Sequence, residues 1–455
     1  MNTITDAMNA VERRAVTVLA GLYAFRMLGL FMVLPLLSLY VDELPDSTPL
    51  LIGLALGAYG LTQALLQIPF GMLSDRIGRK PVIIMGLVIF AAGSLLAANA
   101  ENTMGIIVGR ALQGAGAIAS TMMALVADVT RDHQRTKAMA LMGMSIGFSF
   151  CVALVLGPVI AAWSGLSGVF LVTSMLAVLG IILVVFAVPN SVNINSTHRE
   201  VGTVPALLLK SLIQPQLMRL NSGVFILHFV LMASFLVVPQ ILEQDLHINR
   251  DEHWLIYLCT LLLSLVGMVP LMLIAERFAH LKTVFVGSVL LITVSQGALW
   301  TGSDSLWLYC GALLIFFVGF NYLEATLPSL ISKMVYAGGK GTAMGVYSSC
   351  QFLGAFAGGA LAGWVMQYGG TSAVFAMCAG AGSIWLLLAA TMEQPRNLSN
   401  LVCQFNGEPN HFADAVSSVR ELSGVEEVLM LTDDKTIYLK VDSINFDKNH
   451  LKSFQ

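Results

Sequence analysis

The chain has 455 residues, of which 56% are hydrophobic and 11% are charged, and its mean hydropathy is +0.79. Soluble domains keep roughly a quarter of their residues charged, so this composition excludes an ordinary soluble protein and predicts an integral membrane protein. The formal net charge of −3 says little about partners, and nothing in the sequence predicts nucleic-acid binding. The six cysteines are scattered without a C-x-x-C pair, so we expect neither a disulfide framework nor a metal site.

Apolar runs long enough to cross a bilayer recur along the whole chain. A spanning helix needs about 20 mostly apolar residues. The first run is too long for the apolar core of a signal peptide, so we expect it to be a retained span. The sequence predicts twelve spans, at residues 15–40, 50–72, 81–99, 103–127, 137–162, 166–188, 218–242, 253–275, 282–300, 306–332, 342–367 and 371–392.

The loops between these spans differ in charge. Lys and Arg gather in cytoplasmic loops of membrane proteins. If both termini are cytoplasmic, the outer loops of the membrane region hold a single basic residue, Arg250. The cytoplasmic segments then hold fifteen, namely Arg13, Arg14, Arg76, Arg79, Lys80, Arg131, Arg135, Lys137, Arg199, Lys210, Arg219, Arg277, Lys282, Lys333 and Lys340. We therefore predict an even number of spans with both termini in the cytoplasm.

The longest polar interruption within the membrane region divides the spans into two sets of six. We predict an N-terminal six-helix bundle at 1–188, a cytoplasmic linker at 189–217 and a C-terminal six-helix bundle at 218–392. A weak internal echo between "KAMALMGM" (137–144) and "GTAMGVYS" (341–348) indicates duplication, which is common in secondary transporters.

Charge rises after residue 393, which predicts a cytosolic domain at 393–455. We expect strands at 400–406, 424–432 and 435–442, an amphipathic helix at 410–422 and the start of a second helix after that. The order β-α-β-β-α predicts a small α+β ferredoxin-like domain, whose expected last strand is missing or lies beyond this chain. This domain could bind a small ligand or a nucleotide, or associate with another copy of itself. A metal is not expected, since Cys403 stands without a paired cysteine.

Few charges remain inside the spans, and each is a functional candidate because burying a charge in a bilayer is costly. Glu324 lies midway along the tenth span and is the best proton carrier, and His228 lies midway along the seventh. Arg26 lies within the first span, where it could tune a proton site. The alternatives are a structural ion pair of Glu324 with Arg26 or another buried cation, a packing role for His228 and a strut role for Arg26.

Four sequence motifs resemble those of the major facilitator superfamily, specifically its drug:proton antiporter branch. "GMLSDRIGRK" (71–80) is similar to the family's loop between spans two and three, and "RALQGAGAIA" (110–119) to its fourth-span motif. "RMLGLFMVLPLL" (26–37) resembles the first-span motif, and "LGPVIAA" (156–162) resembles the fifth-span motif with Ala161 and Ala162 in place of two glycines. The residues that the loop, fourth-span and fifth-span motifs single out are Gly71, Asp75, Arg76, Gly78, Arg79, Lys80, Arg110, Gln113, Gly114, Gly157 and Pro158.

The resemblance implies a fold of twelve transmembrane helices in two six-helix bundles and proton-driven efflux by alternating access. It also implies that Asp75 meets the start of the eleventh span, that Arg79 pairs with Asp128, and that this loop is a gate. With the tail domain, the architecture resembles the YajR-type transporters of the bacterial inner membrane.

Three functions remain open at this point. The first is a proton-coupled antiporter that exports small organic, amphipathic compounds. The second is a nutrient symporter or facilitator on the same fold, and the third is a transporter-derived membrane sensor. No nucleophile–base pair, phosphate loop or metal cluster predicts an enzyme, and no cofactor is expected.

Overall fold

The computed structural model describes residues 8–188, 209, 211–277, 280–302, 305–335, 339–393, 398–404, 422–431 and 436–442. Ten helices in this part of the chain are long and apolar enough to cross a membrane. Large apolar side chains such as Val266 and Leu387 are exposed on them. Such exposure suits a protein surrounded by lipid, because helices satisfy their own backbone hydrogen bonds in a medium without water.

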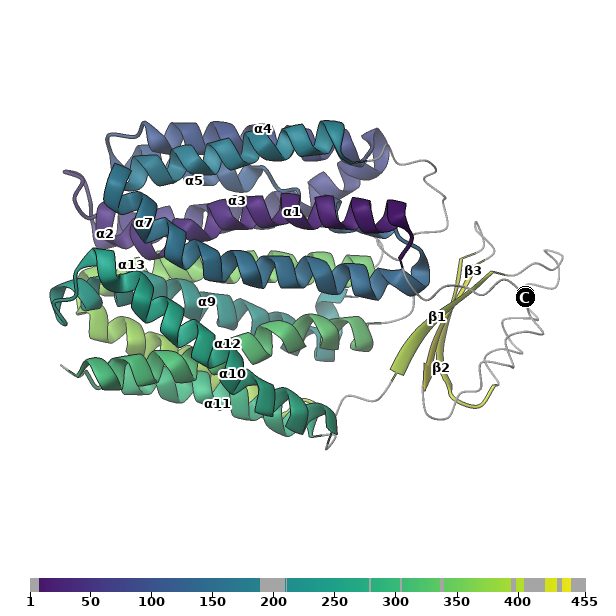
Figure 1. The fold of residues 1–455 in the computed structure, drawn as a ribbon. Helices are drawn as coiled ribbons and strands as arrows, with labels where there is room; N and C mark the ends of the chain where they lie inside the picture. Colours follow the sequence, from purple (N-terminus) through teal and green to yellow (C-terminus); the bar gives the residue numbers. More distant parts are fainter. Residues whose placement is uncertain are drawn as a thin grey trace.

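Figure 1 shows the helices in two layers with nearly parallel axes, one from each half of the chain. The first half forms α1 (Ala10–Met32), α2 (Leu34–Tyr40), α3 (Pro49–Ile77), α4 (Arg79–Ala98), α5 (Thr103–Ala115), α6 (Ala119–Asp128) and α7 (Asp132–Phe186). The second half forms α9 (Pro215–Gln244), η1 (Arg250–Glu252), α10 (His253–Arg277), α11 (Leu281–Trp300), α12 (Leu306–Met334) and α13 (Lys340–Ala390). We call the end of the helix bundle that carries residues 71–80 the Asp75 end, and the opposite end the Arg250 end.

The two longest helices, α7 and α13, each break once. A continuous helix of 55 residues such as α7 would measure about 80 Å, far more than the ~30 Å apolar core of a bilayer. Gly165 in α7 has φ of 64° and Gly370 in α13 has φ of 74°, which are left-handed values that glycine adopts without a steric penalty. The breaks fall in the gaps that the sequence leaves between the fifth and sixth and between the eleventh and twelfth predicted spans.

The first and fourth predicted spans differ in detail from the observed helices. The first begins earlier, at Ala10, because Asn9 and Glu12 form a reciprocal capping box at the helix start. It then bends at Val33, just before Pro35, which lacks a backbone N–H for the helix. The predicted span at 103–127 matches a single apolar stretch, Thr103–Asp128, within which the backbone leaves helical geometry at Gly116 and separates α5 from α6.

The two halves meet along α3 and α13 and, at the Arg250 end, along α2 and α9. A Cβ atom added to Gly53 of α3 would lie 2.2 Å from the carbonyl oxygen of Gly359 of α13, so these backbones are in direct contact. Ser38 of α2 donates to the carbonyl of Phe235 at 3.4 Å, and Gln240 of α9 donates to the carbonyl of Ser38 at 3.3 Å. The halves are therefore closed against each other at the Arg250 end.

Beyond the Asp75 end lies a small antiparallel sheet (Figure 1). Its strands are β1 (Leu398–Gln404), β2 (Val425–Leu431) and β3 (Thr436–Asp442), in the order β1-β3-β2. The three predicted strands match these within two residues. The predicted helices of the tail and residues 189–208 and 210 of the predicted linker lie outside the described residues, so both remain predictions.

Candidate functional site

A polar cluster lies in the second half, where three helices contribute one side chain each. The Nε2 atom of His228 on α9 lies 3.7 Å from Oε2 of Glu324 on α12. The amide of Gln351 on α13 lies between them, 2.8 Å from His228 Nε2 and 3.3 Å from Glu324 Oε1. Gln351 was missed by the sequence reasoning, which considered only ionisable side chains.

Both ring nitrogens of His228 have a polar neighbour. Nδ1 lies 3.2 Å from the carbonyl oxygen of Val224, and Nε2 lies 2.8 Å from the side-chain amide nitrogen of Gln351. This geometry fits the neutral tautomer in which Nδ1 donates to the carbonyl and Nε2 accepts from the amide. The Glu324 side chain is 38% exposed, while His228 is largely enclosed. The cluster thus has two proton-accepting groups within 3.7 Å of each other, and the Oε2 atom of Glu324 is buried without a hydrogen-bond partner among the described residues.

Arg26 lies in the first half and does not pair with Glu324. Its Nη2 donates to Gln63 Oε1 at 2.8 Å, to Tyr59 OH at 3.0 Å and to the carbonyl oxygen of Gly116 at 3.1 Å. Its Nε and Nη1 atoms are buried without a hydrogen-bond partner among the described residues. The break at Gly116 between α5 and α6 provides the carbonyl that Arg26 binds, so the irregular backbone positions this charge.

Arg110 of the fourth-span motif lies close to the same group. It donates to Gln113 at 2.9 Å, and Gln113 in turn donates to Ser94 at 2.8 Å. Its guanidinium carbon lies 5.2 Å from the centroid of the Tyr59 ring, in cation–π geometry. Two buried arginines thus share Tyr59 as a neutral partner, and the ring of Tyr59 also lies 6.0 Å from Phe352 of the second half.

Tyr59, Gln63 and Gln67 form a polar row along α3 that the sequence reasoning missed. Gln63 donates to Gln67 at 2.9 Å. The signal was present, because residues 59, 63 and 67 are four apart and therefore lie on one helix face. Gly114 permits this arrangement, since a Cβ there would lie 2.1 Å from the carbonyl oxygen of Tyr59.

The loop at the Asp75 end brings Arg79 into contact with three side chains. Its Nε donates to Asp128 Oδ2 at 3.0 Å and its Nη1 to Ser74 at 2.7 Å, and it forms an ion pair with Asp75. Gly78 has φ of 96°, so a glycine is favoured at the turn from α3 to α4. Within the described residues, the only ion pair of Asp75 is with Arg79, and none joins it to the start of α13.

The other residues of the predicted motifs lie in different surroundings. Arg76 is exposed and Lys80 is half-buried. A Cβ at Gly71 would come within 3.3 Å of Ser120 Oγ of α6, and one at Gly157 would lie 2.6 Å from the carbonyl oxygen of Met32. Pro158 follows inside α7. Gly157 thus holds α7 against the end of α1, close to the bend at Val33.

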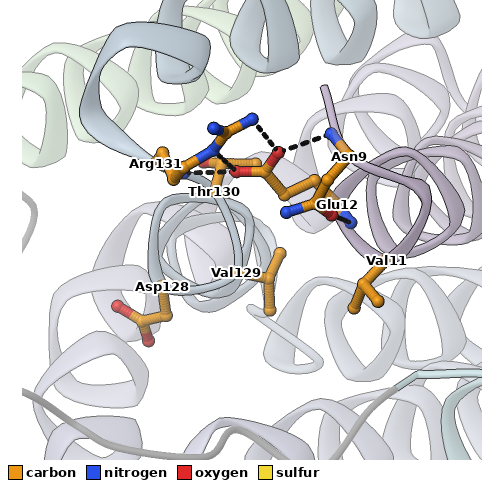
Figure 2. Close-up of a pocket in the computed structure, with 7 residues that line it drawn as sticks. All are labelled: Asn9, Val11, Glu12, Asp128, Val129, Thr130 and Arg131. Atoms are coloured by element: carbon orange, nitrogen blue, oxygen red, sulfur yellow. Dashed lines mark hydrogen bonds and ion pairs between the residues drawn. The ribbon is translucent and has the colours of Figure 1, made fainter. Parts of the chain in front are cut away.

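A shallow pocket at the Asp75 end contains a charge pair that the sequence reasoning missed (Figure 2). The buried carboxylate of Glu12 accepts from the backbone N–H of Arg131 at 2.9 Å, from its Nε at 2.8 Å and from its Nη2 at 2.9 Å. These bonds raise the pKa of Arg131 above its ordinary value, because Glu12 stabilises the charged guanidinium.

Asp128 lines the same pocket but points away from the Glu12–Arg131 pair. The pair fastens the start of α1 to the loop after α6. The Asn-x-x-Glu pattern at 9–12 signalled the cap but not Arg131.

Among the described residues, no group of three or more His, Cys, Asp and Glu side chains could hold a metal ion.

Known proteins give a consistent picture. The chain matches the Major Facilitator Superfamily over residues 19–359 and 220–402. It is 46% identical over 441 residues to the inner membrane transport protein YajR of Escherichia coli K12, a match covering 96% of each chain. It is 28% identical over 350 residues to the multidrug resistance protein MdtH of Aeromonas hydrophila, covering 75% of this chain and 86% of that protein.

Among solved structures, the fold is similar to that of a bacterial homologue of the human lysosomal transporter Spinster in an inward-facing and occupied conformation. The TM-score is 0.66 at 12% identity, and the match covers 85% of this chain and 98% of the other. At this identity the likeness concerns the fold alone.

Proposed function

Because the chain belongs to the Major Facilitator Superfamily and is a transporter of the inner membrane rather than an enzyme, we propose that it couples proton movement to the export of small organic, amphipathic compounds. The observation that carries this proposal is the cluster of Glu324, His228 and Gln351. A carboxylate and an imidazole are both side chains that can bind and release a proton, and here they lie within 3.7 Å of each other. Export is the direction that the name of the multidrug relative MdtH suggests.

Protonation of either member changes the hydrogen bonds of this cluster. A proton on the Glu324 carboxylate neutralises it and weakens its hold on the Gln351 amide. A proton on His228 Nε2 instead forms an imidazolium beside the carboxylate, and the Gln351 amide then turns its oxygen toward the ring. The two protonation states therefore favour different orientations of Gln351 on α13, the helix that packs against α3 of the other half.

The Asp75 end is the cytoplasmic end in this proposal, and both termini lie in the cytoplasm. The breaks at Gly165 and Gly370 each divide one of the ten apolar helices, which supports twelve crossings of the membrane. The strand order β1-β3-β2, with all neighbours antiparallel, supports a ferredoxin-like topology for the tail. We propose that this tail lies in the cytosol and binds a ligand or another copy of itself.

The gate at residues 71–80 acts at this cytoplasmic end. Arg79 links Asp75 to Asp128 within the first half. When the halves close on the cytoplasmic side, Asp75 would meet the start of α13, where the helix dipole favours a carboxylate. In the present structure the halves are closed at the Arg250 end, and Asp75 bonds to Arg79 instead.

Substrate and direction can be tested together. A thermal-shift screen of purified protein against amphipathic compounds would identify ligands, and each ligand would then be followed in everted inner-membrane vesicles. We expect uptake into everted vesicles that starts when respiration acidifies their interior. Accumulation in intact cells rather than everted vesicles would indicate a nutrient symporter, and binding without flux in reconstituted liposomes would indicate a sensor.

A further inference from the structure

Arg250 joins the two halves of the protein at the end opposite the gate motif. Its Nη1 atom lies 2.6 Å from Glu43 Oε1, and its guanidinium carbon lies 5.2 Å from the centroid of the Tyr40 ring. Both of these partners belong to the first half, in α2 and the loop after it. Its Nε atom lies 2.6 Å from Glu243 Oε1 of α9, in its own half. Arg250 is thus held by one half and reaches across to the other.

The loop that carries Glu43 is fastened to the first half. Asp46 in this loop accepts from the backbone N–H of Thr103 at 3.0 Å and from its hydroxyl at 3.1 Å, at the start of α5. The backbone N–H of Thr103 lowers the pKa of the Asp46 carboxyl, since it stabilises the charged form. Glu43 therefore moves with the first half, and Arg250 moves with the second.

Both helices behind this contact, α2 and α9, contain a proline near the Arg250 end. α2 is a seven-residue segment separated from α1 at Val33, and Pro35 removes one hydrogen bond at the bend. α9 carries Pro239 five residues before its own end at Gln244. Between the two, Ser38 is fully buried against the backbone of Phe235. Opening the protein toward the Arg250 end requires α2 to leave α9, which exposes Ser38.

We propose that the contacts of Arg250 with Glu43 and Tyr40, which we call the outer latch, keep the Arg250 end closed. The ion pair with Glu243 holds the Arg250 side chain in position for these contacts. Every opening toward the Arg250 end must break both contacts. The latch rests on the alternating access of the proposed function but not on proton coupling. Because the Glu43 side chain is 58% exposed, the ion pair is of the weak, screened kind. An ion pair of this strength can break and re-form in every transport cycle.

Accessibility of a reporter cysteine measures the latch without substrate or flux. The reporter is Ser38→Cys, in a background where the six native cysteines are replaced. A membrane-impermeant maleimide is added from the Arg250 side to intact spheroplasts, and the labelling rate reports the fraction of open protein. Glu43→Gln removes the ion pair, and Glu43→Lys turns it into repulsion.

The matched controls are Glu252→Gln and Glu252→Lys. They change charge in the same way in the same region, and Glu252 makes no ion pair within the described part of the chain. We expect labelling to rise about two- to fivefold in Glu43→Gln and further in Glu43→Lys, with little change in either control. Higher salt should raise labelling in the parent and leave Glu43→Gln unaffected.

Arg250→Gln should raise labelling at least as much as Glu43→Gln, and the double variant should add little to Arg250→Gln alone. Equal labelling in the parent and both Glu43 variants would overturn the proposal, as would equal increases in the Glu43 and Glu252 series. A chain without proton-coupled transport that still shows the Glu43 pattern would refute the proposed coupling and leave the latch standing.

Discussion

Asp128→Asn should destabilise the protein more than Asp75→Asn, although both carboxylates pair with the same Arg79. The Arg79–Asp128 pair is largely enclosed, with side chains 13% and 14% exposed and a bond of 3.0 Å from Arg79 Nε. Asp75, in contrast, is 39% exposed. Charge-assisted bonds contribute about 1.5–3 kcal/mol when enclosed, whereas exposed pairs contribute about 0–1 kcal/mol.

We therefore expect Asp128→Asn to lower the free energy of unfolding by about 1.5–3 kcal/mol, because asparagine keeps an acceptor oxygen but loses the charge. Asp75→Asn should lower it by at most ~1 kcal/mol. Reversible unfolding by SDS in mixed micelles, followed by tryptophan fluorescence, measures both values. A loss in Asp75→Asn that equals or exceeds the loss in Asp128→Asn would refute the reasoning from burial.

Three further outcomes can be checked on the same preparations. Asp75→Asn should lower maleimide labelling at Ser38→Cys and leave the range of transported compounds unchanged, since Asp75 holds the cytoplasmic side closed. A changed range of compounds with unchanged labelling would place Asp75 at the substrate instead. Gly157→Ala should lower the free energy of unfolding in the SDS assay by about 1–3 kcal/mol, because the new Cβ would press on the backbone of Met32. The control Gly143→Ala should be neutral or stabilising, since a Cβ there meets nothing within 4 Å. Arg26→Gln should lower the free energy of unfolding by about 1.5–3 kcal/mol, because buried charge-assisted bonds to Tyr59, Gln63 and the Gly116 carbonyl are lost, and it should also slow transport tenfold or more. Full transport in this variant would make Arg26 a structural strut.

The sequence predicted the membrane helices well because each one satisfies its backbone internally and must be apolar over a fixed length. It could not locate the break at Gly116, since "GAGAIA" is as compatible with a continuous helix as with two. The Gly116 carbonyl that the break leaves available accepts from a buried guanidinium of α1, ninety residues away. A local pattern cannot report a partner at that separation.

The candidate site was predicted in part for the same reason. Glu324, His228 and Arg26 could be found singly, because charges inside apolar runs are conspicuous. Their partners could not be assigned, and Arg26 bonds to Tyr59 and Gln63 where the sequence left a pair with Glu324 open. The outer latch was harder still, since Arg250 was noticed only as the single basic residue of the outer loops.

The central claim is that Glu324 carries the transported proton, and proton flux in reconstituted liposomes tests it most directly. Liposomes with a pH-sensitive dye inside would receive a compound that the wild-type protein binds and transports. We expect substrate addition to drive proton movement in the wild type, and Glu324→Gln to bind the compound but move no protons. Full proton movement with Glu324→Gln would contradict the account.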